Sequence, residues 1–482
     1  MEQTERVWGF LTPIGKQLYE YWPGLVAGFS LLAAVLAVSH AVLNKRDARA
    51  AAAWTGLIFL LPLIGAALYL LLGVNRIQRR ARQLSPDVTG TSVDLVPVIQ
   101  PRPRPGHLHT LAELSGRLTG LPLLNGNAVT TLEAPAALDD MVAAIEAAED
   151  SVYLATYIFG NDAAGRPLVD ALAAAARRGV QVRVLIDGMG ALYTFPSIVR
   201  RLRRRGVLVE RFLYSLAPWR MPYMNLRNHR KVMIVDRQIG FTGGMNLRAG
   251  YISQPATIRD LHARIDGPVV EHLLRSFAAD WYFTCREHLN TDYAGALDCG
   301  PVLARGISAG PDADLGKRRL TLLAAIGSAQ HEVRIVTPYF VPDQTLLTAL
   351  QLACMRGVRV ELILPGRNNM RLVHWASLHM LPWLVSDGCE LYFSAEPFDH
   401  TKVMTVDGNW SLLGSGNWDA RSLRLNFEFD LECYDEALAE TLNRQMDIRR
   451  ANARRVSLED MQSQGYLRRL RNGFAYVLEP YL

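Results

Sequence analysis

Two long stretches near the N-terminus contain no Asp, Glu, Lys or Arg and dominate the hydrophobic pattern of the first part of the chain. They cover residues 21–44 and 50–75. Because a helix needs about 20 consecutive apolar residues to cross a bilayer, we predict transmembrane helices over about 22–43 and 52–74. These two helices would form a membrane anchor over residues 1–83.

The charges around these stretches bear on processing and topology. Acidic residues at positions 2, 5 and 20 argue against a cleaved signal peptide, and a second apolar stretch follows the first directly. Basic residues are more numerous on the side that would hold both the N-terminus and the segment after residue 75. The positive-inside rule then predicts that this side, with the rest of the chain, is cytoplasmic.

Residues 84–125 include the proline-rich run 101–105 and are predicted to be a linker. After this segment, short apolar runs typical of strands alternate with helical stretches. A strand over 151–159, a helix over 167–178 and a strand over 180–187 show the order. Such alternation is typical of layered α/β domains.

The same order of elements returns in the second half, where strands are predicted over 332–340 and 356–365. The repeat predicts an α/β fold made of two duplicated domains, each a mixed sheet flanked by helices. The first domain would cover 126–300, and the second would cover 301–482 with a C-terminal extension. We expect a pseudo-two-fold axis that brings equivalent segments of both domains to one cleft.

One short motif lies at the same place in each repeat. The first copy consists of His229, Lys231 and Asp236 and is followed by a glycine-rich turn that ends at Asn246. The second copy has the same spacing and contains His400, Lys402, Asp407, Ser415 and Asn417. The chain has 52 Lys and Arg residues but only five Lys, and two of those five stand in the motifs. Chance placement is a poor explanation for both.

A cleft holding both motifs would contain two imidazoles, two ammonium groups and two carboxamides, which suits one phosphodiester. The lysines would neutralise the phosphate, and Asn246, Ser415 and Asn417 would bind its oxygens. One imidazole can attack phosphorus while the other protonates the leaving alcohol. No metal or other cofactor is expected, because no carboxylate cluster accompanies the histidines. Asp236 and Asp407 belong to the catalytic motif, yet their spacing turns them away from the lysines, and we interpret them as bonding the backbone.

The doubled His-x-Lys-x4-Asp pattern, with the apolar hairpin and the segments 156–159, 337–343 and 421–428, resembles the bacterial cardiolipin synthases of the phospholipase D superfamily. This resemblance implies a phosphohistidine intermediate. By position, His229 would be the nucleophile and His400 the general acid/base. The symmetry of the two motifs does not by itself choose between the two histidines.

The resemblance also implies a carboxylate that orients each histidine. Asp260 follows His229 by 31 residues, and Glu428 follows His400 by 28 residues. We therefore expect each histidine to pair with the acid downstream of it. A surface salt bridge is the alternative for each acid.

The implied activity is that of a phosphatidyltransferase that joins two phosphatidylglycerol molecules into cardiolipin and releases glycerol. The implied location is the bacterial inner membrane, as a multi-pass protein whose partners are phosphatidylglycerol and anionic membrane lipid. The net charge of +6 suits an anionic partner. A homo-oligomer is left open.

Three alternatives remain. A membrane-anchored phospholipase D would use water, phosphatidylethanolamine or another alcohol as acceptor. A nuclease would suit the basic charge, but the apolar hairpin argues against nucleic acid as a partner. A scaffold with a dead site is disfavoured because both motifs are intact.

Two further segments have two interpretations each. Residues 212–224 are rich in apolar side chains and would either meet lipid at the mouth of the cleft or pack as a loop. Residues 466–482 mix aromatic side chains with arginine and would either lie on an anionic membrane face or pack as a terminal helix.

Overall fold

The computed structural model describes residues 2–45, 48–73, 106–214, 226–253, 255, 257–291, 298–311 and 314–479. The chain divides into two compact units, Met1–Arg80 and Ala81–Leu482. Three predicted features lie wholly or mostly outside the described residues: the proline-rich run 101–105, the basic residues that follow position 75, and the segment 212–224. Of that last segment only residues 212–214 are described.

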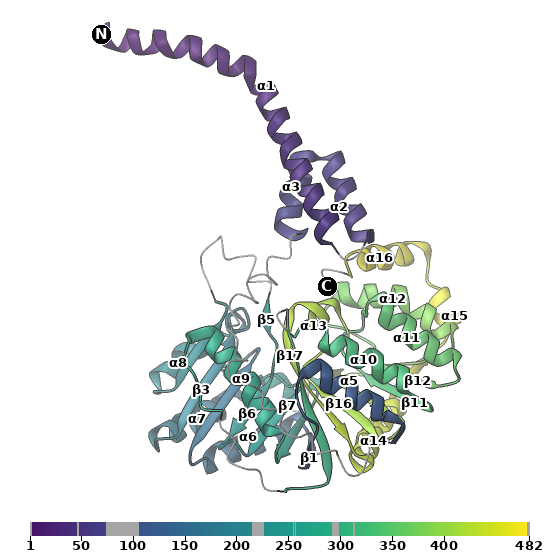
Figure 1. Cartoon of the computed structure of the whole chain (residues 1–482). Coiled ribbons are helices and arrows are strands. Elements are labelled where there is room, and N and C mark those ends of the chain that lie inside the picture. Colours follow the sequence, from purple (N-terminus) through teal and green to yellow (C-terminus); the bar gives the residue numbers. More distant parts are fainter. Residues whose placement is uncertain are drawn as a thin grey trace. The chain divides into compact units, whose positions relative to one another are not determined.

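The first unit begins with one long helix, α1 (Glu2–Asn44) (Figure 1). Its part from Tyr21 to Asn44 is long and apolar enough to cross a membrane, and only 11% of the tested window is buried inside the unit. Large side chains such as Phe29 and Leu36 are exposed along it. An exposed apolar surface of this length fits hydrocarbon better than water.

The second apolar stretch differs from the single helix predicted over 52–74. It consists of α2 (Ala48–Leu60), α3 (Pro62–Leu68) and a π-helical turn, η1 (Tyr69–Gly73). The break falls at Leu61, whose φ of −135° and ψ of 75° are not helical. Pro62 explains the break, because proline disfavours the helical conformation of the residue before it. Among the described residues, α1 is therefore the one helix with the length and composition of a membrane span.

The second unit contains the two repeats. The elements of the first repeat are β1 (Leu124–Glu133), α6 (Ala134–Ala147), β2 (Ser151–Thr156), α7 (Gly165–Arg177), β3 (Gln181–Asp187), η4 (Gly190–Tyr193), α8 (Ile198–Arg204), β4 (Leu208–Phe212), β6 (Val232–Val235), β7 (Ile239–Gly243), β9 (Leu261–Asp266) and α9 (Val270–Cys285). Helices α6, α7 and α8 contribute to one core with β2 and β3, and α9 packs against β2, β4, β6 and β7. All six residues of β2 are buried, as expected for a strand covered on both faces.

The second repeat has equivalent elements. They are β10 (Val302–Ala309), α10 (Lys317–Ser328), β11 (Glu332–Val336), α11 (Gln344–Met355), β12 (Arg359–Pro365), α12 (Arg371–Ser386), β13 (Glu390–Ser394), β15 (Val403–Val406), β16 (Trp410–Gly414), α13 (Ala420–Arg424), β17 (Asn426–Tyr434) and α14 (Glu436–Ala451). The chain ends with β18 (Ala453–Val456), α15 (Leu458–Gln462) and α16 (Tyr466–Val477). The α/β duplication predicted from the sequence is confirmed.

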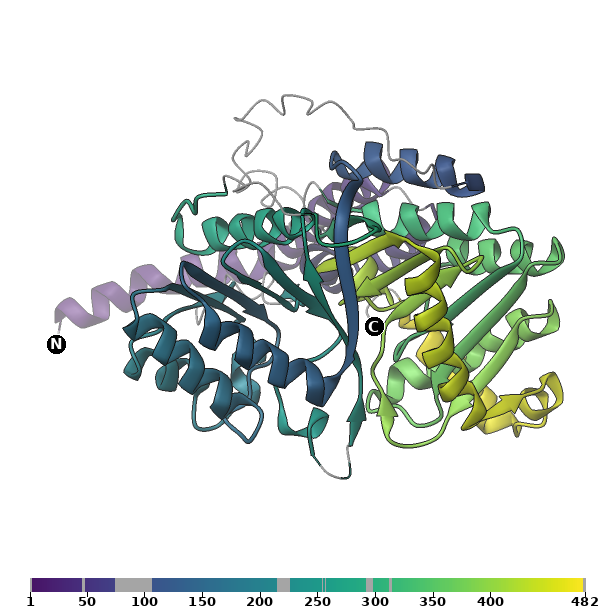
Figure 2. The ribbon, with the colours of Figure 1, turned by 90° about the horizontal axis from the view of Figure 1, so that it is seen from below.

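The two repeats share one 16-stranded sheet, in which 15 strands follow one path and the remaining strand, β5 (Arg227–Asn228), pairs with β17. Its strand order, β18-β13-β12-β11-β15-β16-β17-β10-β1-β9-β7-β6-β2-β3-β4, mirrors itself about the antiparallel pair β10–β1, apart from the extra edge strand β18. Figures 1 and 2 show the two repeats on either side of β1. The pseudo-two-fold axis therefore runs through a shared sheet.

The segment 106–125, predicted as part of the linker, is folded. It contains a 3-10 turn, η3 (Gly106–Leu108), a helix, α5 (His109–Thr119), and the start of β1. Leu108 and Leu111 are buried in the core of the second repeat, and α5 packs against α10. Because α5 packs in the core of the second repeat, residues 106–125 are part of the folded second unit, and the prediction of a linker over this segment is wrong.

Candidate active site

Two short parallel ladders join the repeats at the motifs. Strand β5 (Arg227–Asn228) of the first repeat pairs with the start of β17 in the second, with Asn228 opposite Phe427. Strand β14 (Phe398–Asp399) of the second repeat pairs with β8 (Ile258–Arg259) of the first. Each motif histidine follows the last residue of such a ladder, so each lies against the other repeat.

The ladder between β5 and β17 brings His229 to Glu428. The backbone N–H of His229 donates to the carbonyl oxygen of Phe427 over 2.9 Å. The next residue in β17 is Glu428, and its Oε2 lies 2.9 Å from His229 Nδ1. Both side chains are buried, with 8% of His229 and 0% of Glu428 exposed.

The second ladder brings His400 to Asp260 in the same way. The backbone N–H of His400 donates to Arg259 over 2.7 Å, and Nδ1 of the ring lies 2.8 Å from Asp260 Oδ2. The expected pairing of each histidine with its own downstream acid is therefore wrong. The pairs are crossed between the repeats, because residues paired in parallel register sit side by side whatever their separation along the chain.

Glu428 is held by more than His229. Its carboxylate accepts hydrogen bonds from Ser415 Oγ at 2.6 Å, Ser422 Oγ at 2.8 Å and Asn426 Nδ2 at 3.1 Å. Ser415 is fully buried and also accepts from the backbone N–H of Phe429. Ser415, predicted to bind phosphate, therefore contacts the carboxylate behind His229, and its phosphate contact stays a prediction.

Asp260 has fewer partners. Besides its contact with His400, Asp260 accepts a hydrogen bond at Oδ1 from the backbone N–H of Leu261 at 2.8 Å. Gly244, which stands where the second repeat has Ser415, has no room for a Cβ because the Asp260 carboxylate fills that space. The two carboxylates are therefore equivalent in position and different in environment.

The lysines turn back over their own histidines. Lys231 Nζ donates to the carbonyl oxygen of His229 at 2.8 Å, and Lys402 Nζ donates to that of His400 at 2.6 Å. Electrostatic interactions link the two repeats, since Lys402 lowers the pKa of Lys231 and Lys231 lowers the pKa of His400. The four motif side chains thus form one electrostatic cluster.

The asparagines of the two turns are buried beside this cluster, with Asn246 at 6% and Asn417 at 4% exposure. Asn246 Nδ2 donates to Tyr251 Oη at 3.2 Å. The Oδ1 atoms of both asparagines are buried without a hydrogen-bond partner among the described residues. Buried polar atoms are seldom left unpaired, so these two carboxamides have capacity for a ligand.

Burial shifts the pKa values of the cluster. It lowers the pKa of Lys231 to about 7 and that of Lys402 to about 8. Burial also lowers the pKa of both histidines, partly offset at His229 by the negative charge of Glu428. The cluster is therefore poised to gain or lose protons near neutral pH.

The pKa values of Asp260 and Glu428 shift in opposite directions. Burial raises the pKa of Asp260 to about 8 although Lys402 opposes this. Burial also acts to raise the pKa of Glu428, but the charges of His229 and Lys231 and the hydrogen bonds from His229 and Ser415 lower it to about 2. His229, through its charge and its hydrogen bond, lowers the pKa of Glu428 most, and Lys231 and Ser415 add to this effect.

Asp236 and Asp407, which the sequence grouped with the catalytic motif, lie at the far ends of β6 and β15 from the histidines. Asp236 accepts from the backbone N–H groups of residues 149, 150 and 151 at 2.8–2.9 Å. Asp407 accepts from those of residues 330, 331 and 332 at 2.8 Å. Both hold a turn, in agreement with their interpretation as backbone-bonding residues.

Several residues at the site were not found from the sequence. Tyr251 Oη lies 3.3 Å from His400 Nδ1. Arg230, between His229 and Lys231, donates to the carbonyl oxygen of Glu428 at 3.1 Å and to Asp280 at 2.5 Å. The arginine between the motif histidine and lysine was the available signal for Arg230, whereas no pattern in the sequence marks Tyr251.

Each histidine contacts a tyrosine whose own partner, Tyr193 or Asn369, belongs to a segment with exposed apolar side chains, and we call these side chains the apolar rim. In the first repeat, Tyr157 stands 5.2 Å from His229 and 6.4 Å from Tyr193 between ring centroids. In the second, Tyr339 stands 6.0 Å from His400 and donates to Asn369 at 2.8 Å. The exposed residues of the rim are Leu192, Tyr193, Phe195, Met370 and Leu372.

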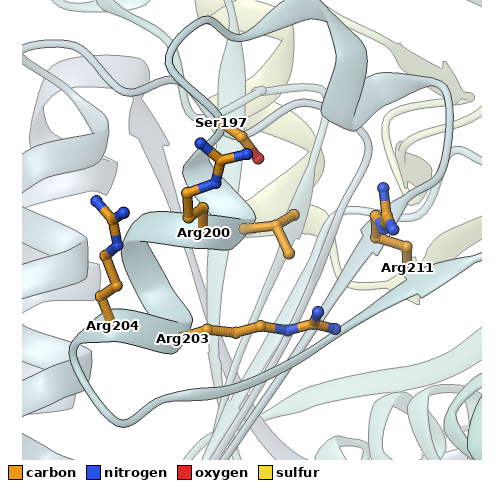
Figure 3. Close-up of a pocket in the computed structure, with 6 residues that line it drawn as sticks. Ser197, Arg200, Arg203, Arg204 and Arg211 are labelled. Carbon is orange, nitrogen blue, oxygen red and sulfur yellow. The ribbon is translucent and has the colours of Figure 1, made fainter.

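A cavity of about 450 Å³ between α8 and β4 does not include the motif residues. It is lined by Ser197, Val199, Arg200, Arg203, Arg204 and Arg211. In Figure 3, Arg200, Arg203 and Arg204 extend from α8, and Arg211 lies across from them on β4. Nη2 of Arg203 also lies 3.5 Å from Oε2 of Glu210. None of the residues predicted to bind phosphate lines this cavity.

Comparison with known proteins places this site in a family. A family model described as cardiolipin synthase, PLD-like domain, matches residues 141–281 and 322–449, which include both motifs. A model described as phospholipase D-nuclease N-terminal matches residues 32–73. Cardiolipin synthase A of Pseudomonas putida (strain GB-1) is 32% identical over 473 residues, covering 96% of this chain and 99% of that protein.

A second relative and one solved structure extend the comparison. Cardiolipin synthase of Geobacillus kaustophilus is 31% identical over 509 residues, with 100% of both chains covered. A phosphatidylserine synthase of Haemophilus influenzae has the same fold, with a TM-score of 0.60 and 16% identity over 77% of this chain and 100% of that chain.

Proposed function

The chain belongs to the cardiolipin synthase family of phospholipase D-like phosphatidyltransferases. We propose that it joins two phosphatidylglycerol molecules into cardiolipin and releases glycerol. In the first step, Nε2 of His229 forms a bond to phosphorus as the bond to glycerol breaks, and His400 protonates the leaving glycerol. In the second step, His400 removes a proton from the glycerol hydroxyl of another phosphatidylglycerol. That oxygen bonds to phosphorus, and His229 is released.

The two carboxylates support this division of roles. Ionised Glu428 accepts the Nδ1 proton of His229, which leaves the Nε2 lone pair free for attack. Asp260, whose pKa is about 8, keeps its proton near neutral pH and can donate it to His400 Nδ1. His400 then carries its own proton on Nε2, where a leaving oxygen can take it. Two carboxyl groups with separated pKa values commonly mark separate acid and base roles.

The phosphate would lie between the lysines and the asparagines. Lys231 and Lys402 would balance the charge that develops on the non-bridging oxygens, and the amide groups of Asn246 and Asn417 would donate to them. The carboxamide nitrogen of Asn246 carries two protons and donates one of them to Tyr251 Oη, so the second can be donated to a phosphate oxygen. The apolar rim supports a lipid substrate, since exposed apolar side chains beside a polar site can contact acyl chains.

The observation that carries the proposal is the crossed arrangement of His229 with Glu428 and His400 with Asp260 in one cluster. The test uses the purified full chain and vesicles of labelled phosphatidylglycerol. We expect cardiolipin and glycerol in equal amounts. Phosphatidic acid without cardiolipin would instead identify a phospholipase D that uses water, and a new phospholipid on adding phosphatidylethanolamine would identify that lipid as an acceptor.

Variants separate chemistry from folding. His229→Ala and His400→Ala should each abolish product formation. His331→Ala is a matched control, because His331 is exposed and only its backbone contacts Asp407. Full activity of His229→Ala would exclude a phosphohistidine at His229, and full activity of His400→Ala would exclude His400 as the general acid/base.

We further propose that the protein lies in the bacterial cell membrane, with both apolar stretches inserted and the second unit in the cytoplasm. The apolar surface of α1 and the match of residues 32–73 to an N-terminal family model support membrane association. Helices α2 and α3 would cross the bilayer as a broken helix packed on α1 through Ala37, Ala41 and Ile58. Reporter fusions after residue 45 and after residue 482 test the topology, and opposite sides are expected for the two.

A further inference from the structure

The last helix, α16, has an unusual distribution of side chains. One of its faces packs on α12, where Arg471 stacks over Trp375 at 4.4 Å and Tyr476 contacts Trp383 and His379. Figure 1 shows α16 beside α12. Of its residues, Asn472 and Ala475 are buried. The face of α16 that packs on the second repeat therefore contains Arg471, Asn472, Ala475 and Tyr476.

The opposite face of α16 is apolar and exposed. Its residues, with their exposed fractions, are Tyr466 76%, Leu467 78%, Leu470 42%, Phe474 67%, Val477 72% and Leu478 44%. At 3.6 residues per turn these positions fall within about one third of the helix circumference. A water-soluble helix normally has the reverse pattern, with its apolar stripe turned to the core.

Arginines border this apolar face on both sides. Arg469 lies at one edge and Arg471 at the other, by the same helical geometry, and Arg468 adds a third positive charge in the first turn. The sequence of α16 from Tyr466 to Val477 contains no acidic residue. A helix with an apolar stripe between arginines is typical of helices that lie in the headgroup region of a bilayer.

The neighbouring surface continues this face. Trp383 of α12 is 39% exposed, and Leu372 in the first turn of α12 is 46% exposed. Leu372 also belongs to the apolar rim, and α16 runs in the same direction as α12 because Arg471 meets Trp375 and Tyr476 meets Trp383. The start of α16 is therefore at the end of α12 that adjoins the rim.

We propose that α16 lies in the interface of a bilayer that contains anionic phospholipid, with Leu470 and Phe474 among the acyl chains and the exposed Arg468 and Arg469 on lipid phosphates. Charge complementarity selects this occupant, since the arginines that border the apolar face attract anionic headgroups. The proposal concerns a contact of the second unit with lipid besides the N-terminal anchor. It does not depend on which reaction the site performs.

The test places an environment-sensitive fluorophore on Phe474→Cys in the full chain, with the exposed cysteines replaced by Cys285→Ser and Cys299→Ser. The protein is incorporated into nanodiscs of phosphatidylcholine, with or without phosphatidylglycerol. We expect a blue-shifted emission and quenching by lipids that carry a nitroxide near the headgroup, both stronger with phosphatidylglycerol. Arg469→Gln should reduce quenching in the phosphatidylglycerol discs toward the value in phosphatidylcholine alone.

The matched control is the same fluorophore on Ile448→Cys, because Ile448 is 62% exposed on α14. We expect neither a blue shift nor quenching there. Absence of quenching at position 474 in phosphatidylglycerol discs would overturn the proposal. A blue shift that is already present in detergent, without quenching by lipid, would also overturn the proposal. It would indicate that residues 2–73 or a second copy of the chain, and not lipid, covers the apolar face of α16.

Discussion

Replacement of Asp407 should reduce stability and leave the chemistry intact, although this residue belongs to the repeated motif. Its carboxylate accepts three backbone N–H groups at 2.8 Å and His107 Nε2 at 2.6 Å. Two of these N–H groups are exposed enough for water to replace the carboxylate. The loss of each of the three hydrogen bonds should therefore lower the free energy of unfolding by about 1 kcal/mol. Asp407 also has a φ of 50°, and alanine in that left-handed conformation costs about 1 kcal/mol more.

Asp407→Ala should therefore lose about 4 kcal/mol of unfolding free energy in total. Asp407→Asn should lose about half of that, because asparagine tolerates the left-handed conformation and keeps one carbonyl oxygen. The assay is thermal unfolding of the purified chain in detergent, followed by tryptophan fluorescence. Turnover is measured well below the transition and normalised to folded protein.

The control is His229→Gln, which should lose turnover and keep the unfolding transition, because a carboxamide can still donate to the buried Glu428 carboxylate. If Asp407→Asn kept its transition but lost turnover by orders of magnitude, Asp407 would take part in the reaction and the structural assignment would be refuted.

The same contact predicts a pH dependence. Hydrogen bonds from the three N–H groups outweigh burial and lower the pKa of Asp407 below its ordinary value. A group with a depressed folded pKa contributes stability above its unfolded pKa and loses it as pH falls through the folded value. The stability difference between the wild type and Asp407→Asn should therefore shrink below about pH 4.

Three further predictions concern the active site. Glu428→Gln removes the negative charge that raises the pKa of His229, so the acid limb of the pH profile of kcat/KM should move to lower pH. Asp260→Asn should leave that limb in place. The reverse result would show that each histidine pairs with the acid of its own repeat. Ser415→Ala removes a 2.6 Å donor to Glu428 and should lower kcat roughly tenfold with little change in KM, while a rise in KM alone would indicate a phosphate contact. Substrate affinity should fall as pH rises above 8, because Lys402, with a pKa of about 8, loses its charge there; a KM that is constant up to pH 10 would contradict this.

The order of strands and helices was predictable because it depends on local periodicity. Apolar runs in the neighbourhood of β2 and β3 and the repeated order at β11 and β12 indicated the duplicated α/β fold. Two local features were missed. Pro62 signals the break at Leu61, and α5 was obscured by the proline-rich sequence before it, although Leu108 and Leu111 are both buried.

The motif residues could be recognised from the sequence alone, because histidine and lysine at a repeated spacing carry their chemistry with them. Which acid serves which histidine was decided only by the tertiary structure. Parallel pairing of β5 with β17 and of β14 with β8 sets His229 beside Glu428 and His400 beside Asp260. Register between strands depends on the packing of both repeats around a shared sheet, and separation along the chain contains no information about it.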